Sequence, residues 1–313
     1  MRGNKYFRRY AWKTVLLLLV CTTLSIHSAL AGRLHASQTD RASIRDLLFS
    51  HARTPQLTED SITSLPESNP RPSFLQKQYA EQQSKRPRRK APSWAELQKR
   101  YPGSFVIGGP RGERKVALTF DDVPDPRFTP QILDILARYK VRATFFVVGS
   151  RASKHPSMVK RIGREGHIIG NHSYNHAVFS RISLPAFQQQ VLQTDAILRP
   201  LAGYSPRLIR PPYGEILPEQ IVWMKRNGYI AVNWDVDSSD WRGIDSNKVL
   251  LNIKKTLQPG SIVLQHAGGG TGQNLSGTIE ALPRLIKLLR SKGYQIVTLP
   301  DLLSKPAARS TEP

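Results

Sequence analysis

The chain has 313 residues, which is enough for one large α/β domain or two small ones. It carries 46 Lys and Arg against 23 Asp and Glu, a formal charge of +23. Its one cysteine, Cys21, lies in an N-terminal apolar stretch that we expect to be removed, which excludes a disulfide-stabilised domain and a cysteine nucleophile in the mature chain.

The first 31 residues have the layout of a secretory signal peptide. A basic head precedes an apolar stretch from Val15 to Ile26, and the small residues Ala29 and Ala31 follow it. We therefore expect residues 1–31 to be cleaved after Ala31 and the protein to be secreted or associated with the cell surface. An uncleaved membrane anchor is the less favoured alternative, because the apolar stretch is shorter than the roughly 20 residues of a spanning helix.

Residues 32–111 are rich in basic residues, Ser, Gln and Pro and have sparse apolar periodicity. This composition predicts a basic, largely disordered linker, since it offers too little apolar surface for a compact fold. Without residues 1–31, which hold five basic residues and no acid, the net charge is 41 − 23 = +18. The expected counter-charge is an anionic cell envelope and not nucleic acid. The simpler interpretation, which we favour, is that the charge aids solubility and loose adhesion; no obligate protein partner is inferred.

From Lys115 onward, short apolar runs alternate with segments of helical periodicity. Strands are predicted at residues 115–121, 143–149, 167–171, 207–210, 229–235, 261–265 and 295–299. Helices are predicted between them, at residues 130–140, 155–165, 184–202, 217–227, 246–257 and 277–292. The alternation predicts an α/β domain over residues 112–305 with a parallel sheet, followed by a loose tail at 306–313. We favour closure into a barrel of about seven parallel strands, although spacing alone does not distinguish a barrel from a doubly wound sheet.

Polar residues that strand periodicity does not explain stand where the predicted strands end. In chain order they are Asp121 and Asp122, His172 and His176, Arg210, the three carboxylates Asp235, Asp237 and Asp240, and His266. In parallel α/β folds the carboxyl ends of the strands share one face, and that face carries the chemistry. We therefore expect these side chains to converge.

The spacing His172-x3-His176 allows two imidazoles to bind one ion from the same side. One carboxylate completes a three-ligand set that leaves a position open for water, as in catalytic zinc sites. A histidine pair alone is weak evidence, but Asp121 and Asp122 are predicted at the same sheet edge. A cation neutralises one of these carboxylates and lowers the pKa of bound water toward about 7, and the other carboxylate can take the proton.

Three further motifs supply candidate residues. Arg210 precedes two prolines and can orient the base carboxylate, the alternative being an exposed turn arginine. His266 ends an apolar strand and can protonate a leaving group, the alternative being a core histidine. The segment DSSDW, residues 237–241, offers a carboxylate to orient that histidine and a tryptophan, Trp241, that stacks on a sugar or anchors its loop.

Five motifs together resemble those of the polysaccharide deacetylases, the NodB-homology enzymes of carbohydrate esterase family 4. They are TFDD (119–122), HSYNH (172–176), RPPYG (210–214), DSSDW (237–241) and LQH (264–266). The resemblance covers about residues 112–303, and five motifs in order make it specific. It implies a distorted (β/α) barrel and the hydrolysis of N-acetyl groups from an acetylated amino-sugar polymer.

The resemblance also implies a role for each matching residue. Asp122, His172 and His176 are similar to the ligands of a divalent metal, usually zinc, with cobalt or another ion as an alternative. Asp121 resembles the catalytic base and Arg210 the residue that orients it.

The remaining motif residues resemble the acid and the substrate-binding groups of the family. His266 resembles the general acid and Asp240 the carboxylate that positions it. Tyr213 resembles the residue whose backbone amide holds the oxyanion, Trp241 the groove wall and Leu264 a wall of the acetyl pocket.

Two positions depart from the family pattern. Val123 stands where the family usually has glycine, and a valine with positive φ there would be strained. Ala267 follows His266 where related sequences often carry Asp or Asn. Peptidoglycan, chitin-like oligomers and poly-N-acetylglucosamine all remain candidate substrates. The alternative function is a non-catalytic wall-binding protein with a deacetylase-like barrel, which would have no chemical need for the intact Asp-Asp-His-His-His set.

Overall fold

The computed structural model describes residues 92–310. The expected signal peptide, residues 1–31, lies outside the described residues, as does the expected linker up to residue 91. No helix between residues 92 and 310 combines the length and hydrophobicity that a membrane crossing requires.

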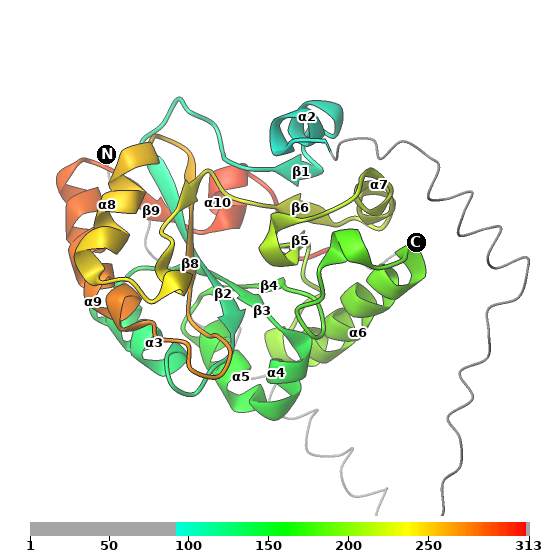
Figure 1. Cartoon of the computed structure of the whole chain (residues 1–313), viewed down its shortest axis with the longest axis horizontal. Helices are drawn as coiled ribbons and strands as arrows, with labels where there is room; N and C mark the ends of the chain where they lie inside the picture. The colour runs from blue at the N-terminus through cyan, green and yellow to red at the C-terminus, as the bar shows by residue number, and fades with distance from the viewer. Residues whose placement is uncertain (1–91, 311–313) are drawn as a thin grey trace, which may run out of the picture. The chain divides into compact units, whose positions relative to one another are not determined.

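A parallel β-sheet forms the centre of the fold (Figure 1). Its strands are β1 (Phe105–Val106), β2 (Lys115–Val123), β3 (Thr144–Val147), β4 (Ile168–Asn171), β5 (Leu208–Ile209), β6 (Ile230–Val232), β7 (Val236–Asp237), β8 (Ser261–His266) and β9 (Gln295–Val297). The order is β1-β6-β5-β4-β3-β2-β8-β7, with β9 also beside β2, and all of these pairings are parallel. The end strands β1 and β7 do not pair with each other within the described residues, so the sheet is an open half-barrel. The predicted parallel α/β barrel is therefore confirmed as a distorted one, with short strands added to the seven expected.

Helices surround the strands (Figure 1). They are α2 (Trp94–Arg100), α3 (Thr129–Arg138), α4 (Gly149–Lys154), α5 (Pro156–Arg164), α6 (Leu184–Ala202), α7 (Pro218–Arg226), α8 (Ser246–Thr256), α9 (Ser276–Ser291) and α10 (Leu299–Leu303). The main core lies between β2, β3 and β8 on one side and α3, α5, α8 and α9 on the other. Phe120 and Phe145 of neighbouring strands stack at 5.2 Å, and Leu133 and Leu285 are fully buried against the same cluster.

The boundary signals of the sequence explain where these helices begin and end. Pro130 stands in the first turn of α3, where its missing N–H costs nothing. Gly166, Gly228 and Gly293 follow the ends of α5, α7 and α9 and have φ of +79°, +74° and +73°. This left-handed conformation ends a helix and is open to glycine at little cost.

Residues 92–111, which we expected to belong to a linker, are part of the folded domain. Ser93 caps α2 through a capping box with Glu96, and Leu97 is buried. Strand β1 follows, pairs with β6, and buries Phe105 completely. The domain therefore begins before residue 112, because an apolar face of this segment covers the edge of the sheet.

The segment expected to be a tail after residue 305 is also held to the domain. Ala308 forms an antiparallel bridge with Pro206. The Arg309 Nη2 atom lies 2.8 Å from Asp195 Oδ2, and the Arg309 guanidinium covers the ring of Tyr229 at 4.4 Å. The described domain therefore extends to residue 310.

Candidate metal and catalytic site

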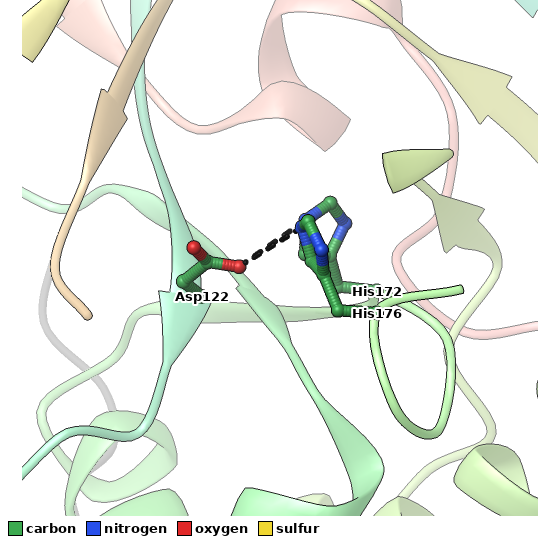
Figure 2. A group of neighbouring side chains, drawn as sticks. All are labelled: Asp122, His172 and His176. Carbon is green, nitrogen blue, oxygen red and sulfur yellow. Dashed lines mark ion pairs between the residues drawn. The ribbon is translucent and has the colours of Figure 1, made fainter. Parts of the chain in front are cut away.

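Three side chains from two strand ends face one another in Figure 2. Asp122 lies at the end of β2, and His172 and His176 follow β4. Asp122 Oδ1 lies 3.2 Å from Nε2 of His176 and 3.7 Å from Nε2 of His172. All three ligand atoms lie within 4.8 Å of one another, so one ion can contact all of them.

The donors of this group fit a divalent cation. Asp122 Oδ1 is buried and has no hydrogen-bond partner within the described residues, which is costly unless a cation compensates it. His172 Nδ1 lies 2.8 Å from the carbonyl oxygen of Arg210; because a carbonyl only accepts, Nδ1 carries the proton and Nε2 offers its lone pair. Burial lowers the pKa of His172 to about 3, so this imidazole is neutral, as a metal ligand must be.

The backbone at the end of β2 turns sharply to present Asp122. Asp122 has a φ of 65°, an uncommon value for a residue with a side chain, and its carbonyl accepts a 2.8 Å hydrogen bond from Arg151 Nη1. Gly268 lies against the same carbonyl so closely that a Cβ there would be 2.0 Å from the oxygen. The strain that we expected at Val123 does not arise, because Asp122 takes the positive φ and Val123 continues the strand.

Asp121 and Arg210 form a buried ion pair beside the metal group. Arg210 Nη1 donates to Asp121 Oδ1 at 2.8 Å and to Thr119 Oγ1 at 2.7 Å. The Arg210 guanidinium also lies 4.2 Å from the ring centre of Phe146, which fixes its plane. Burial raises the pKa of Asp121, and the Arg210 guanidinium offsets part of that rise. The second oxygen of Asp121, Oδ2, lies 3.8 Å from His172 Nε2, so this carboxylate borders the cation position.

His266 and Asp240 form the opposite wall. His266 ends β8 and is the register partner of Asp121 on β2. Its Nδ1 lies 2.7 Å from Asp240 Oδ1, while Asp240 Oδ2 accepts from the His266 backbone N–H and from the hydroxyl of Thr278. Burial acts to lower the pKa of His266, but the contact with Asp240 outweighs it and raises the pKa to about 9. The imidazole is therefore protonated at neutral pH, with Nε2–H free to donate.

The three expected substrate-binding residues lie on the rim and in the floor of the same region. Tyr213 is 63% exposed, has a φ of 59°, and packs its ring 4.9 Å from that of His176. Trp241 is 51% exposed, whereas Leu264 is buried in β8 two residues before His266. The exposed aromatic rings of Tyr213 and Trp241 are available to a ligand, and Leu264 offers an apolar surface.

The structure adds residues that sequence reasoning did not single out. Thr119 and Thr278 hydrogen-bond Arg210 and Asp240, and Arg151 holds the Asp122 carbonyl. Trp94 donates from Nε1 to the carbonyl of Gly214 at 3.1 Å, next to Tyr213. Only Thr119 lies within one of the motifs, so the motif pattern could have indicated that residue alone.

Comparisons with known proteins agree with this geometry. Residues 108–232 match the family model described as polysaccharide deacetylase. A peptidoglycan-N-acetylglucosamine deacetylase of Bacillus cereus is 43% identical over 206 residues, which cover 66% of this chain and 74% of the relative.

Solved structures of the same fold are also similar. A peptidoglycan N-acetylglucosamine deacetylase in complex with 4-naphthalen-1-yl-N-oxidanyl-benzamide is 41% identical, with a TM-score of 0.66 over 71% of this chain and 100% of that chain. A carbohydrate esterase family 4 pseudoenzyme from Bacillus anthracis is 26% identical, with a TM-score of 0.59 over 66% of this chain and 71% of that chain.

Proposed function

The chain belongs to the polysaccharide deacetylase family, and on that premise we propose that it hydrolyses the carbon–nitrogen bond of the N-acetyl group, with the N-acetylglucosamine of peptidoglycan as its substrate. The names of the similar Bacillus cereus protein and of the solved relative support this choice of polymer. The observation that carries the catalytic assignment is the position of two proton-transfer groups, Asp121 and His266, on neighbouring strands at the edge of the candidate metal group.

We further propose that Asp122, His172 and His176 hold the divalent cation, with zinc as the first choice. A mixed set of one carboxylate and two imidazoles suits zinc or cobalt better than magnesium or calcium. When bound, the cation would act as a Lewis acid toward the acetyl carbonyl and the attacking water.

The chain's own residues perform the remaining steps. Asp121, held by Arg210, takes a proton from the water as its oxygen bonds to the acetyl carbon. The backbone N–H of Tyr213 donates to the oxyanion that develops. His266 then gives its proton to the departing nitrogen as the carbon–nitrogen bond breaks, so that acetate and a free amine leave the site.

The change Asp121→Asn tests the assignment of the base. We expect the zinc-loaded variant to release acetate from N-acetylglucosamine oligomers at least about 100-fold more slowly than the unchanged protein, because general base catalysis is lost. Asp134→Asn, at an exposed position on α3, is the matched control and should retain full activity. The competing function, a non-catalytic wall-binding protein, is supported instead if the unchanged protein binds zinc and yet releases no acetate from several acetylated polymers.

The N-terminal segment supports a further proposal, that the protein is exported and held near an anionic envelope. The signal-peptide pattern and the charge of +18 after residue 31 are its basis. N-terminal sequencing of the exported protein should begin at Gly32, and an intact Met1 would favour the membrane anchor instead. Binding to anionic wall polymer should weaken steeply with added salt, because exposed charges are screened.

A further inference from the structure

A cavity of about 340 Å³ lies beside the catalytic site, and neither the metal ligands nor Asp121 or His266 line it. It lies between α2 and α8, and we call it the α2–α8 pocket. The residues that define it are Trp94, Trp234, Asp237, Ser239, Asn252 and Lys255. Its volume falls within the range of small-molecule sites.

One wall of the α2–α8 pocket is aromatic. The rings of Trp94 and Trp234 meet edge to face with their centres 4.9 Å apart. Both residues are only half-buried, so part of each indole surface faces the cavity. Indole rings of this kind offer an apolar surface to the C–H face of a sugar ring.

The facing wall is polar and offers both hydrogen-bond donors and acceptors. Asp237 uses Oδ1 to accept the backbone N–H of Ser239 at 2.6 Å, and its other oxygen has no hydrogen bond within the described residues. Lys255 is exposed near the end of α8, and its side chain makes no hydrogen bond or ion pair with another described residue. A second lining carboxylate, Asp235, is already neutralised by Arg111 at 2.9 Å. The free groups therefore suit a neutral ligand that carries several hydroxyls.

Two lining residues of the α2–α8 pocket contact or pair with residues of the proposed substrate site. Asp237 is the register partner of Leu264, the expected wall of the acetyl pocket. Trp94 donates its Nε1–H to Gly214, the residue after Tyr213. A Cβ on Gly214 would lie 2.3 Å from the Trp94 ring, so the indole and this loop are in direct contact. A polymer whose acetyl group lies at the site can thus extend a further unit into the pocket.

We propose that the α2–α8 pocket is a saccharide subsite that binds a second hexosamine ring of the glycan, one that is not deacetylated in the same turnover. The proposal rests on the proposed deacetylase function. The ring stacks on one indole face of the edge-to-face Trp94–Trp234 pair, and its hydroxyls donate to Asp237 and accept from Lys255. Trp94 precedes residue 108, where the match to the family model begins, so the subsite draws on a residue outside the matched region.

The change Lys255→Leu tests the subsite, with Lys254→Leu as its control, because Lys254 is the exposed neighbour that does not line the pocket. Acetate release by the zinc-loaded full chain is measured on N-acetylglucosamine itself, which has no second ring, and on its pentamer. We expect Lys255→Leu to raise KM for the pentamer about fivefold, the effect of one lost hydrogen bond, and to leave KM for the monosaccharide unchanged. Equal KM values for the two variants on the pentamer, or equal losses on both substrates, would overturn the subsite.

A spectroscopic readout separates this proposal from the proposed function. In protein labelled with 5-fluorotryptophan, we expect the pentamer to shift the ¹⁹F signals of Trp94 and Trp234 together with that of Trp241 on the catalytic rim. If acetate is released and Trp241 alone shifts, the subsite is wrong while the deacetylase function stands. If no acetate is released and no signal shifts, the proposed function fails and the subsite fails with it.

Discussion

Asp240 controls the protonation of His266 at the scale of single residues. Its carboxylate lies 2.7 Å from the ring, and the pKa of His266 rises to about 9. Since the acid must be protonated, we expect kcat/KM to fall as the pH rises through about 9. Asp240→Asn removes the charge that stabilises the imidazolium, so the alkaline limb of the pH profile of acetate release should move to lower pH. An unchanged limb in Asp240→Asn, with Asp134→Asn as control, would contradict the assignment of His266 as the acid.

Trp94 acts on the same chemistry from outside the motifs. It contacts the loop of Tyr213 through Gly214, so we infer that it is a positioning residue for the oxyanion-binding amide. Trp94→Ala should lower kcat on N-acetylglucosamine itself, which has no second ring, by about tenfold. Trp94→Phe, which keeps an aromatic ring but not the Nε1–H donor, should restore part of it. Zinc affinity should stay unchanged in both variants. A loss of unfolding free energy without a change in kcat would show that the role of Trp94 is structural only.

Some site residues could be predicted from the local sequence pattern, and others could not. Asp121, Asp122, His172, His176, Arg210, Asp240 and His266 each stand at or after a strand end, so the strand pattern and the motifs together placed them on one face. Trp94 hydrogen-bonds Gly214, which lies 120 residues away in the sequence, and Thr278 hydrogen-bonds Asp240, which lies 38 residues away. No neighbouring residue marks such a contact, and for that reason the sequence did not reveal it.

At the scale of elements, the N-terminal edge of the sheet tests the domain boundary. Phe105 of β1 is fully buried between α2 and β6 in a cluster with Leu97 and Ala231. Phe105→Ala should lower the free energy of unfolding by about 3–5 kcal/mol, as measured by urea denaturation. Leu251→Ala, at a position 53% exposed, should change it by less than about 0.5 kcal/mol. If the two variants are equally stable, β1 contributes nothing to the core.

Element prediction succeeded where periodic segments were long and failed where they were short. The six predicted helices are confirmed to within a few residues, as are the main strands. Strands β1 and β7 have two residues each and were not predicted, whereas β5, which is as short, lies within the predicted strand 207–210. Helix α4 begins at Gly149 inside the predicted strand 143–149. Helix α2 does carry a local signal, the Ser93–Glu96 capping box, but it lies in a segment whose basic and polar composition favoured a linker.

At the scale of the whole molecule, the half-barrel pairs β2 with β8 and so brings together Asp121 and His266, which lie 145 residues apart in the sequence. The open edge between β1 and β7 leaves room at the side of the sheet for α2 and the α2–α8 pocket. The fold therefore brings the proposed cation position, the proposed base and acid, and the proposed sugar subsite to one region of the molecule. All of these assignments depend on the proposal that Asp122, His172 and His176 hold a cation.

The most direct test is a zinc titration of metal-stripped protein in which acetate release from N-acetylglucosamine oligomers is followed at each addition. We predict that the metal-stripped protein releases no acetate and that the rate of acetate release rises linearly with added zinc until it saturates at one zinc per chain. The Asp122→Asn variant should neither bind the ion tightly nor recover activity. Full acetate release by the stripped protein, or the same zinc titration curve in Asp122→Asn, would contradict the account.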